Sequence, residues 1–130
     1  MGRAAGRILI VDDEPPLLKM MSVYLGRLGY TVVTAGSTEQ ARAQVETAPA
    51  AFAAVVIDAT MAGSSMEDLA LGLLRANPAL CVLATSGYPV DMAALRSAAP
   101  GRADFLHKPF SPEMLESALR RLLAAQKEEL

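Results

Sequence analysis

Acidic side chains directly follow two short apolar segments of this sequence. Asp12 and Asp13 come after the run 7–11, and Asp58 comes after the run 53–57. If these carboxylates converge they repel one another, so holding all of them ionised requires a compensating cation. Ligand sets made only of oxygen suit a hard ion such as Mg²⁺, which binds one or two carboxylates together with phosphate oxygens. The residues therefore predict a magnesium site, with Mn²⁺ as the alternative metal.

A hydroxyl group and an ammonium group belong to two further apolar segments. Ser86 follows the run 80–85, and Lys108 ends the run 104–108. Lysine is a compact positive charge that can contact an incoming phosphoryl group, and a serine hydroxyl can donate to a phosphoryl oxygen. A carboxylate close to a metal ion and a lysine can attack phosphorus. Because phosphoryl transfer needs mainly positioning and charge neutralisation, this set indicates formation of an aspartyl phosphate without histidine or cysteine.

These residues can act together only if the apolar segments are strands of one sheet. Apolar or β-rich runs predict strands at 7–11, 30–35, 53–57, 80–85 and 104–108. Helical spacing between the runs predicts helices at 15–28, 37–47, 65–77, 90–98 and from 112 onward. This alternation specifies an α/β domain with a parallel sheet and right-handed crossovers. Ligands bind such sheets at the carboxyl ends of the strands, where all of these polar residues stand.

Capping residues mark the beginnings of two predicted helices. Ser37, with Gln40 three residues on, forms a capping-box pattern. Ser64 or Ser65 can cap the third helix, because an acidic residue follows each of them three positions later. These signals set the helix starts within a residue or two.

The first and last helices have the clearest apolar faces. In the first, apolar residues recur at helical spacing until Gly29 ends the run. In the last, Ser111 is the expected N-cap and Pro112 fits the first helical position. The apolar stripe of the last helix is predicted to contain Met114, Leu115, Ala118, Leu119 and Leu122.

The composition favours one domain with no general affinity for polyanions. The 130 residues are 52% hydrophobic and 20% charged, which suits one buried core, expected at 7–126 with short flexible termini at 1–6 and 127–130. A formal net charge of −2 and a pI near 5.3 argue against general attraction to nucleic acid or an anionic membrane. No stretch approaches the ~20 apolar residues of a membrane span, and the N-terminus lacks a secretory signal, so a cytoplasmic location is expected.

Two other kinds of site are disfavoured, a nucleotide-binding site of the dinucleotide or Walker type and a reactive cysteine. The turn after the first strand reads Asp-Asp-Glu-Pro-Pro instead of a glycine-rich loop, so it would repel a nucleotide's phosphates unless a metal intervened. Cys81 is the only cysteine, and it lies in an apolar run. A buried, inert thiol is therefore expected.

Taken in this order, the motifs resemble those of the receiver domains of bacterial response regulators and hybrid sensor kinases. The resemblance covers roughly residues 7–125 and implies a flavodoxin-like, doubly wound (βα)5 fold with strand order 2-1-3-4-5. The segment 86–89, Ser-Gly-Tyr-Pro, looks most like receivers attached to hybrid sensor kinases. The matching motifs are Asp12-Asp13, the single Asp58, Ser86-Gly87 and Lys108-Pro109-Phe110.

The resemblance implies a role for each residue of the site. Asp58 is the implied phosphoacceptor, Asp13 a direct magnesium ligand and Asp12 a ligand acting mainly through water. The backbone carbonyl of Thr60 completes the protein's share of the metal ligands. The chain is then a signalling domain that assists its own phosphorylation and dephosphorylation, rather than an enzyme.

The resemblance also implies a switch. Ser86 contacts the phosphoryl group and moves toward it, Lys108 pairs with it, and Phe105 stands at the position of an aromatic residue that turns inward. These movements change the surface formed by the last two strands and the last two helices, a shift between two states biased by one charged group. A histidine kinase or a histidine phosphotransfer protein is the implied donor, and this surface is also a candidate homodimer interface.

The sequence departs from the family's pattern at two places. Met61-Ala62 replaces the usual Met-Pro, which leaves that loop less restrained. Phe105 has no hydroxyl, unlike the tyrosine often found at the switch position, so output through it must rely on packing.

Two other functions are consistent with parts of the pattern. A pseudo-receiver would bind partners without phosphorylation, but its signature is a missing acid or lysine. A small Mg²⁺-dependent phosphatase of the haloacid dehalogenase type also uses an aspartate nucleophile, but it would need its two aspartates separated by one residue, and additional chain for a cap.

Several residues near the site also have a simpler interpretation. The simpler interpretation of the acidic run at 12–14 is that its negative charges interact favourably with the N-terminus of the following helix and do nothing more. Strand alternation directs His107 away from the face of Lys108, so it is interpreted as structural. Glu14 and Thr85 are treated as neighbours with no assigned role.

Overall fold

The computed structural model describes residues 6–48, 51–61 and 65–129, with only the backbone of 127–129 described. Predicted features at Ala62, at Ser64 and in the terminus 1–5 lie outside these residues. The strands are β1 (Arg7–Val11), β2 (Thr31–Ala35), β3 (Phe52–Asp58), β4 (Cys81–Ser86) and β5 (Ala103–His107). The helices are α1 (Pro15–Arg27), α2 (Thr38–Thr47), α3 (Met66–Ala76), α4 (Ala93–Ala98) and α5 (Pro112–Glu129).

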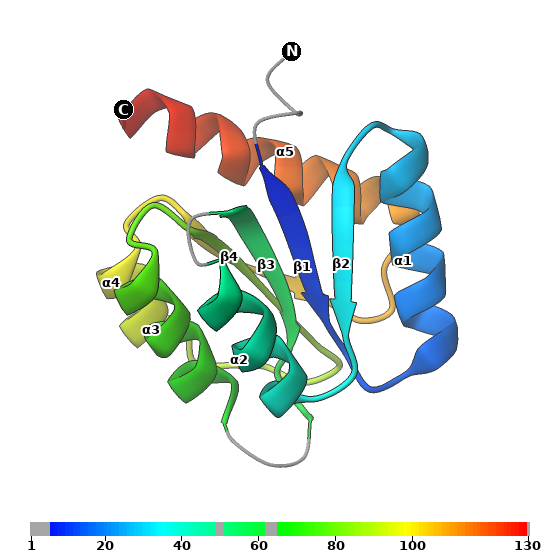
Figure 1. The fold of residues 1–130 in the computed structure, drawn as a ribbon, viewed down its shortest axis with the longest axis horizontal. Helices are drawn as coiled ribbons and strands as arrows, with labels where there is room; N and C mark the ends of the chain where they lie inside the picture. Colours follow the sequence, from blue (N-terminus) through cyan, green and yellow to red (C-terminus); the bar gives the residue numbers. More distant parts are fainter. Residues whose placement is uncertain (1–5, 49–50, 62–64, 130) are drawn as a thin grey trace.

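The five strands form one parallel sheet in the order β2-β1-β3-β4-β5. Helices cover both faces, with α1 and α5 on one side and α2, α3 and α4 on the other (Figure 1). The predicted flavodoxin-like, doubly wound architecture is confirmed. Because all strands point the same way, their carboxyl ends lie at a single edge of the sheet.

Each face of the sheet has its own apolar core. On β1, Leu9 and Val11 pack in the core beneath α2, α3 and α4, whereas Ile8 and Ile10 pack in the core beneath α1 and α5. This alternation explains why β1 is a nearly continuous apolar run. Cys81 is buried in the second core, as expected for a structural thiol. The two cores hold the central strands rigidly, and with them the residues at the strand ends.

The C-terminal helix differs from the prediction at one residue. Leu115, Ala118, Leu119 and Leu122 are buried against the sheet, but Met114 is 48% exposed. The buried residues follow the i, i+3, i+4, i+7 spacing of one helix face, and Met114 lies one position outside it. The prediction that Met114 belongs to the apolar stripe is therefore wrong.

The fourth helix is shorter than predicted. It begins at Ala93 instead of near residue 90, because the side chain of Asp91 accepts a hydrogen bond from the Ala93 N–H (2.9 Å). This bond stabilises a turn immediately before the helix. No helix within the described parts of the chain is long and apolar enough to cross a membrane.

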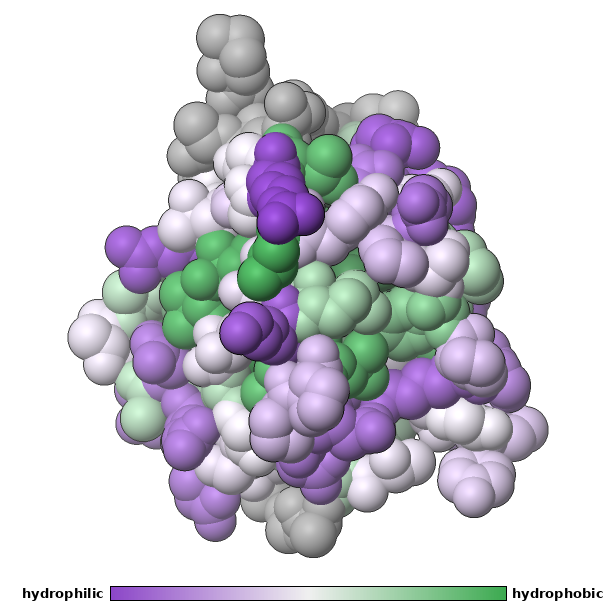
Figure 2. Space-filling view, turned by 90° about the vertical axis from the view of Figure 1, so that its right-hand side faces the viewer, coloured by the Kyte–Doolittle hydropathy of each residue, from purple (hydrophilic) through white to green (hydrophobic). Residues whose placement is uncertain are grey.

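The apolar residues of α1 do not all face the core. Met21 and Leu25 are buried, whereas Val23 of α1 and Leu28, directly after the helix, are about two-fifths exposed. The side of the molecule that carries α1 accordingly shows apolar surface among hydrophilic groups (Figure 2). Gly29 follows the helix with a φ of 100°, a conformation that glycine adopts without strain.

The predicted cap of α2 by Ser37 is confirmed, but the Gln40 side chain bonds the Gly36 N–H instead of the Ser37 N–H that a capping box uses. The Ser37 hydroxyl oxygen accepts a hydrogen bond from the Gln40 N–H (3.1 Å), and the Gln40 side chain accepts one from the Gly36 N–H (2.7 Å). Replacing Ser37 with alanine is expected to lower the free energy of unfolding by about 1 kcal/mol, because an amide of the first turn loses its partner. Urea denaturation followed by circular dichroism measures this loss. Ser97→Ala, on an exposed position of α4, is the control, and an equal effect of both changes would contradict the prediction.

Candidate functional site

The carboxyl ends of three strands and the loop after a fourth contribute to one polar site. Asp12 directly follows β1, Asp58 is the last residue of β3, Ser86 is the last residue of β4, and Lys108 follows β5. Adjacent parallel pairing aligns Asp58 with Thr85 of β4, and Ser86 with His107 of β5. The predicted convergence of these strand ends is therefore present in the fold.

Lys108 is at the centre of the site. Its Nζ donates hydrogen bonds to Asp12 Oδ2 (3.1 Å), Glu14 Oε1 (3.0 Å) and Asp58 Oδ2 (3.3 Å). Its backbone N–H donates to the Ser86 carbonyl (2.8 Å), which fixes the start of the loop after β5. A single ammonium group thus compensates three carboxylates from two strand ends and a loop.

Burial and charge shift the pKa values of two of these groups in the same direction for different reasons. The Asp12 side chain is only 2% exposed, and burial raises its pKa, although hydrogen bonds from the Glu14 N–H and from Lys108 partly oppose the rise. For Lys108, burial alone would lower the pKa. Hydrogen bonds to Glu14 and Asp12, and the charges of Asp12 and Asp58, outweigh burial and raise it above its usual value. The site therefore holds a firmly protonated lysine beside a carboxylate that is costly to ionise.

Asp58 is oriented by the residues that follow it. Its Oδ1 accepts hydrogen bonds from the Thr60 N–H (2.9 Å) and from the Thr60 hydroxyl (2.7 Å), and its Oδ2 faces Lys108. The Ala59 N–H donates to the Thr85 carbonyl (2.8 Å), which ties this turn to β4. One carboxylate oxygen is thus held by the turn, and the other is presented to the lysine. The sequence indicated a role for the Thr60 backbone but not for its hydroxyl.

Ser86 and Phe105 lie on the neighbouring strands β4 and β5. Ser86 is fully buried, and its hydroxyl oxygen accepts a hydrogen bond from the Tyr88 N–H (3.0 Å). Phe105 is half-buried and packs against the core beneath α2, α3 and α4. Its ring makes an edge-to-face contact with His107, with 6.3 Å between ring centroids. The structure therefore places Phe105 between the core and the surface, on the side of β5 that faces the core beneath α2, α3 and α4.

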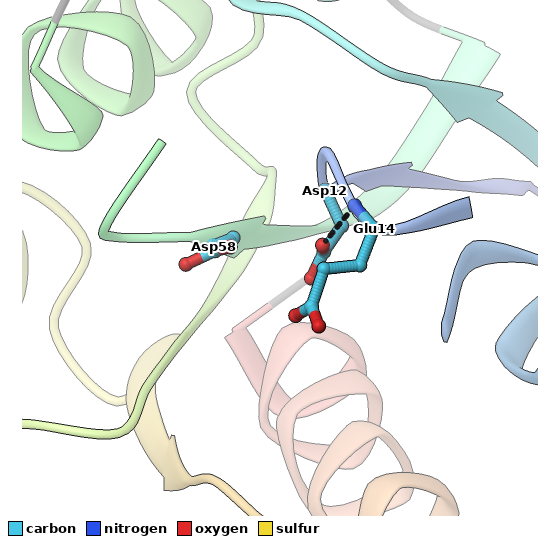
Figure 3. Close-up of side chains that lie close together, drawn as sticks. All are labelled: Asp12, Glu14 and Asp58. Atoms are coloured by element: carbon cyan, nitrogen blue, oxygen red, sulfur yellow. Dashed lines mark hydrogen bonds between the residues drawn. The ribbon is translucent and has the colours of Figure 1, made fainter. Parts of the chain in front are cut away.

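The carboxylates that lie together are not the set expected from the sequence. Asp12, Glu14 and Asp58 each offer an oxygen, and these oxygens lie within 4.8 Å of one another (Figure 3). Asp13 is exposed and is not in this group. Glu14, which sequence reasoning left without a role, is in the group because the Glu14 N–H donates to Asp12 Oδ1 (2.9 Å), which turns the chain back over the site.

The donor set suits a hard divalent cation. All of the available side-chain ligand atoms are carboxylate oxygens, and two of the three carboxylates are buried. Oxygen ligands of this kind match Mg²⁺ and Mn²⁺ rather than a metal that prefers sulfur or imidazole. The residues present therefore fit the predicted cofactor.

Excess negative charge at the site is expected to destabilise the metal-free protein. Asp12→Asn removes a buried charge while keeping a carbonyl oxygen for Lys108, so it is expected to raise the free energy of unfolding in a chelating buffer by up to about 1 kcal/mol. The same change is expected to weaken the stabilisation that Mg²⁺ gives to the wild type. Urea titrations with and without Mg²⁺ test both effects. Glu46→Gln is the control, because it removes one negative charge at an exposed position of α2. It is expected neither to raise the free energy of unfolding nor to weaken the stabilisation by Mg²⁺.

Comparison with known sequences identifies one family. The family described as response regulator receiver domain matches residues 8–120. The probable transcriptional regulatory protein TcrX of Mycobacterium tuberculosis is 33% identical over 126 residues, covering 95% of this chain and 53% of that protein. The phosphate regulon transcriptional regulatory protein PhoB of Pseudomonas aeruginosa is 31% identical over 120 residues, covering 89% of this chain and 51% of that protein. The chain thus spans about half the length of these relatives.

Solved structures agree in fold. A CheY-like response regulator receiver domain protein of Methanospirillum hungatei superposes with a TM-score of 0.84 at 24% identity, over 96% of this chain and 98% of that one. A response regulator receiver protein of Sinorhizobium medicae superposes with a TM-score of 0.80 at 26% identity, over 94% and 97% of the two chains.

Proposed function

Because the chain belongs to the family of response regulator receiver domains, we propose that it accepts a phosphoryl group on Asp58 during two-component signal transduction in the cytoplasm. The observation that carries this proposal is the contact of Lys108 Nζ with Asp58 Oδ2 at the end of a buried strand (3.3 Å). A nucleophilic carboxylate beside a fixed positive charge is the arrangement that this chemistry requires.

The proposed donor is a phosphohistidine on a histidine kinase or on a histidine phosphotransfer protein. The nitrogen–phosphorus bond of the donor breaks and a bond forms between phosphorus and an oxygen of Asp58. Thr60 holds Oδ1 of Asp58 through two hydrogen bonds, which orients the carboxylate for attack by Oδ2. Lys108 then pairs with the transferred group, and the Ser86 hydroxyl donates to one of its oxygens. The chain is thus a substrate that assists its own modification, not an enzyme acting on a separate substrate.

Receiver domains bind Mg²⁺ at an acidic pocket, and this chain has the corresponding cluster. We assign the metal to Asp12, Asp13, Asp58 and the backbone carbonyl of Thr60, with Mn²⁺ as an alternative ion. When bound there, the ion would supply positive charge that offsets the charge of the phosphoryl oxygens. Asp13 is exposed in this structure, so its side chain would have to turn inward to serve as a ligand.

The proposed output is a change in the surface formed by β4, α4, β5 and α5. Ser86 moves toward the new anion, and the Phe105 ring turns inward into the space that this movement leaves. What supports this role for Phe105 is its half-buried position against the core, which allows an inward and an outward orientation. The α4-β5-α5 part of this surface is the proposed homodimer interface.

Intact-mass measurement after incubation with acetyl phosphate tests the proposal. The wild type is expected to gain the mass of one phosphoryl group in Mg²⁺ and to remain unmodified in a chelating buffer. The added group is expected to be labile to hydroxylamine, as an acyl phosphate is, and to map to the peptide that contains Asp58. If the wild type stays unmodified and beryllofluoride also causes no spectral change, the chain is instead an interaction module that works without phosphorylation.

A further inference from the structure

The ammonium group of Lys108 has no donor left for a new partner. A lysine side chain offers three N–H donors, and here the Nζ contacts three carboxylates, those of Asp12, Glu14 and Asp58. A phosphoryl group on Asp58 would present additional oxygens to the same Nζ. Lys108 can bind such an oxygen fully only if it gives up, or weakens, one of its present contacts.

The three present partners differ in how easily they can be released. The side chains of Asp12 and Asp58 are 2% and 3% exposed, so without a metal ion, losing the lysine would leave two buried charges with no cation beside them. The side chain of Glu14 is 61% exposed, so water can replace the lysine at little cost. Glu14 is therefore the partner that Lys108 can exchange.

The surroundings of Glu14 allow its side chain to move while its backbone stays in place. The Glu14 N–H is held by Asp12 Oδ1 at 2.9 Å (Figure 3). Glu14 lines an open hollow of about 610 Å³, together with residues that include Leu17, Met20, Lys108 and Phe110. Rotation of the Glu14 side chain into this hollow would release Lys108 without any change in the sheet.

We propose that Glu14 is a positioning residue that competes with the phosphoryl group for Lys108. The inference rests on the proposed phosphorylation of Asp58. It assigns Glu14 a part in setting the equilibrium between the unphosphorylated and phosphorylated states. In the unphosphorylated protein Glu14 saturates the lysine, and in the phosphorylated protein it gives up that contact to a phosphoryl oxygen. Shortening or neutralising Glu14 then favours the phosphorylated state.

Equilibrium binding of beryllofluoride, which mimics the phosphoryl group on a carboxylate, tests the inference at saturating Mg²⁺. Glu14→Gln is expected to tighten binding roughly two- to fivefold, the range for loss of a competing exposed ion pair. Glu14→Asp, which keeps the charge but shortens the reach, is expected to tighten binding as well. Glu46→Gln, an exposed substitution on α2, changes net charge equally and is expected to leave the affinity unchanged.

Three results would overturn the inference, and each has a distinct meaning. Equal affinities in the wild type, Glu14→Gln and Glu14→Asp would show that Glu14 does not compete for Lys108. Tightening by Glu14→Gln alone would assign the effect to general charge repulsion. A tenfold or greater loss of Mg²⁺ affinity in Glu14→Gln, measured by calorimetry, would instead make Glu14 part of the metal site, as a ligand or as a residue that orients one. Failure of the wild type to bind beryllofluoride would reject the proposed function itself, whatever the variants do.

Discussion

Asp58→Asn is expected to abolish incorporation of the phosphoryl group while leaving the protein folded. The amide keeps the shape of the side chain and an acceptor for the Thr60 N–H, but it is not a nucleophile toward phosphorus. Because the negative charge next to Asp12 and Glu14 also disappears, no loss of stability is expected. Intact mass after treatment with acetyl phosphate and Mg²⁺ should therefore show only the unmodified variant.

A matched control separates loss of the acceptor from loss of an acidic side chain in general. Asp91→Asn changes an exposed aspartate in the loop before α4, and it is expected to be phosphorylated to the same extent as the wild type. Circular dichroism should show that both variants are folded. Modification that persists in Asp58→Asn at the wild-type level would place the acceptor at another residue and refute the assignment.

Lys108→Met is expected to cause a large loss of stability in the metal-free protein at neutral pH. Methionine keeps the length of the aliphatic chain but removes the only cation that contacts Asp12 and Asp58 among the described residues. Both carboxylates are almost fully buried, and leaving buried charges uncompensated is costly. The free energy of unfolding is expected to fall by about 2–4 kcal/mol, a range that allows for the partial exposure of the lysine.

The same variant should respond strongly to magnesium. A divalent cation can replace the missing positive charge, so Mg²⁺ is expected to raise the stability of Lys108→Met more than it raises that of the wild type. Urea denaturation in a chelating buffer and in Mg²⁺ measures both values. Lys19→Met, on the exposed side of α1, is the control and is expected to change the stability by less than about 0.5 kcal/mol. If the two lysine variants behaved alike, Lys108 would not be the compensating charge of this site.

The order of the elements, and the ends of the strands to within one residue, can be read from the amino-acid sequence alone. A strand buried on both faces is a continuous apolar run, so its end is visible where a charged residue first appears, as it does at Asp12 and at Asp58. Caps are equally local, because the Ser37 hydroxyl bonds an amide only three residues away. Such features depend on neighbours along the chain and can be read from it.

The partners of Lys108 depend instead on how the strands and loops pack in three dimensions. Asp12, Asp13 and Glu14 are consecutive acids, and nothing in their types says which of them will face a lysine nearly a hundred positions away. The turn after β1 directs Asp12 and Glu14 toward the lysine and leaves Asp13 exposed. That choice depends on where the loop after β5 places Lys108, which is a property of the packed sheet and not of either segment alone.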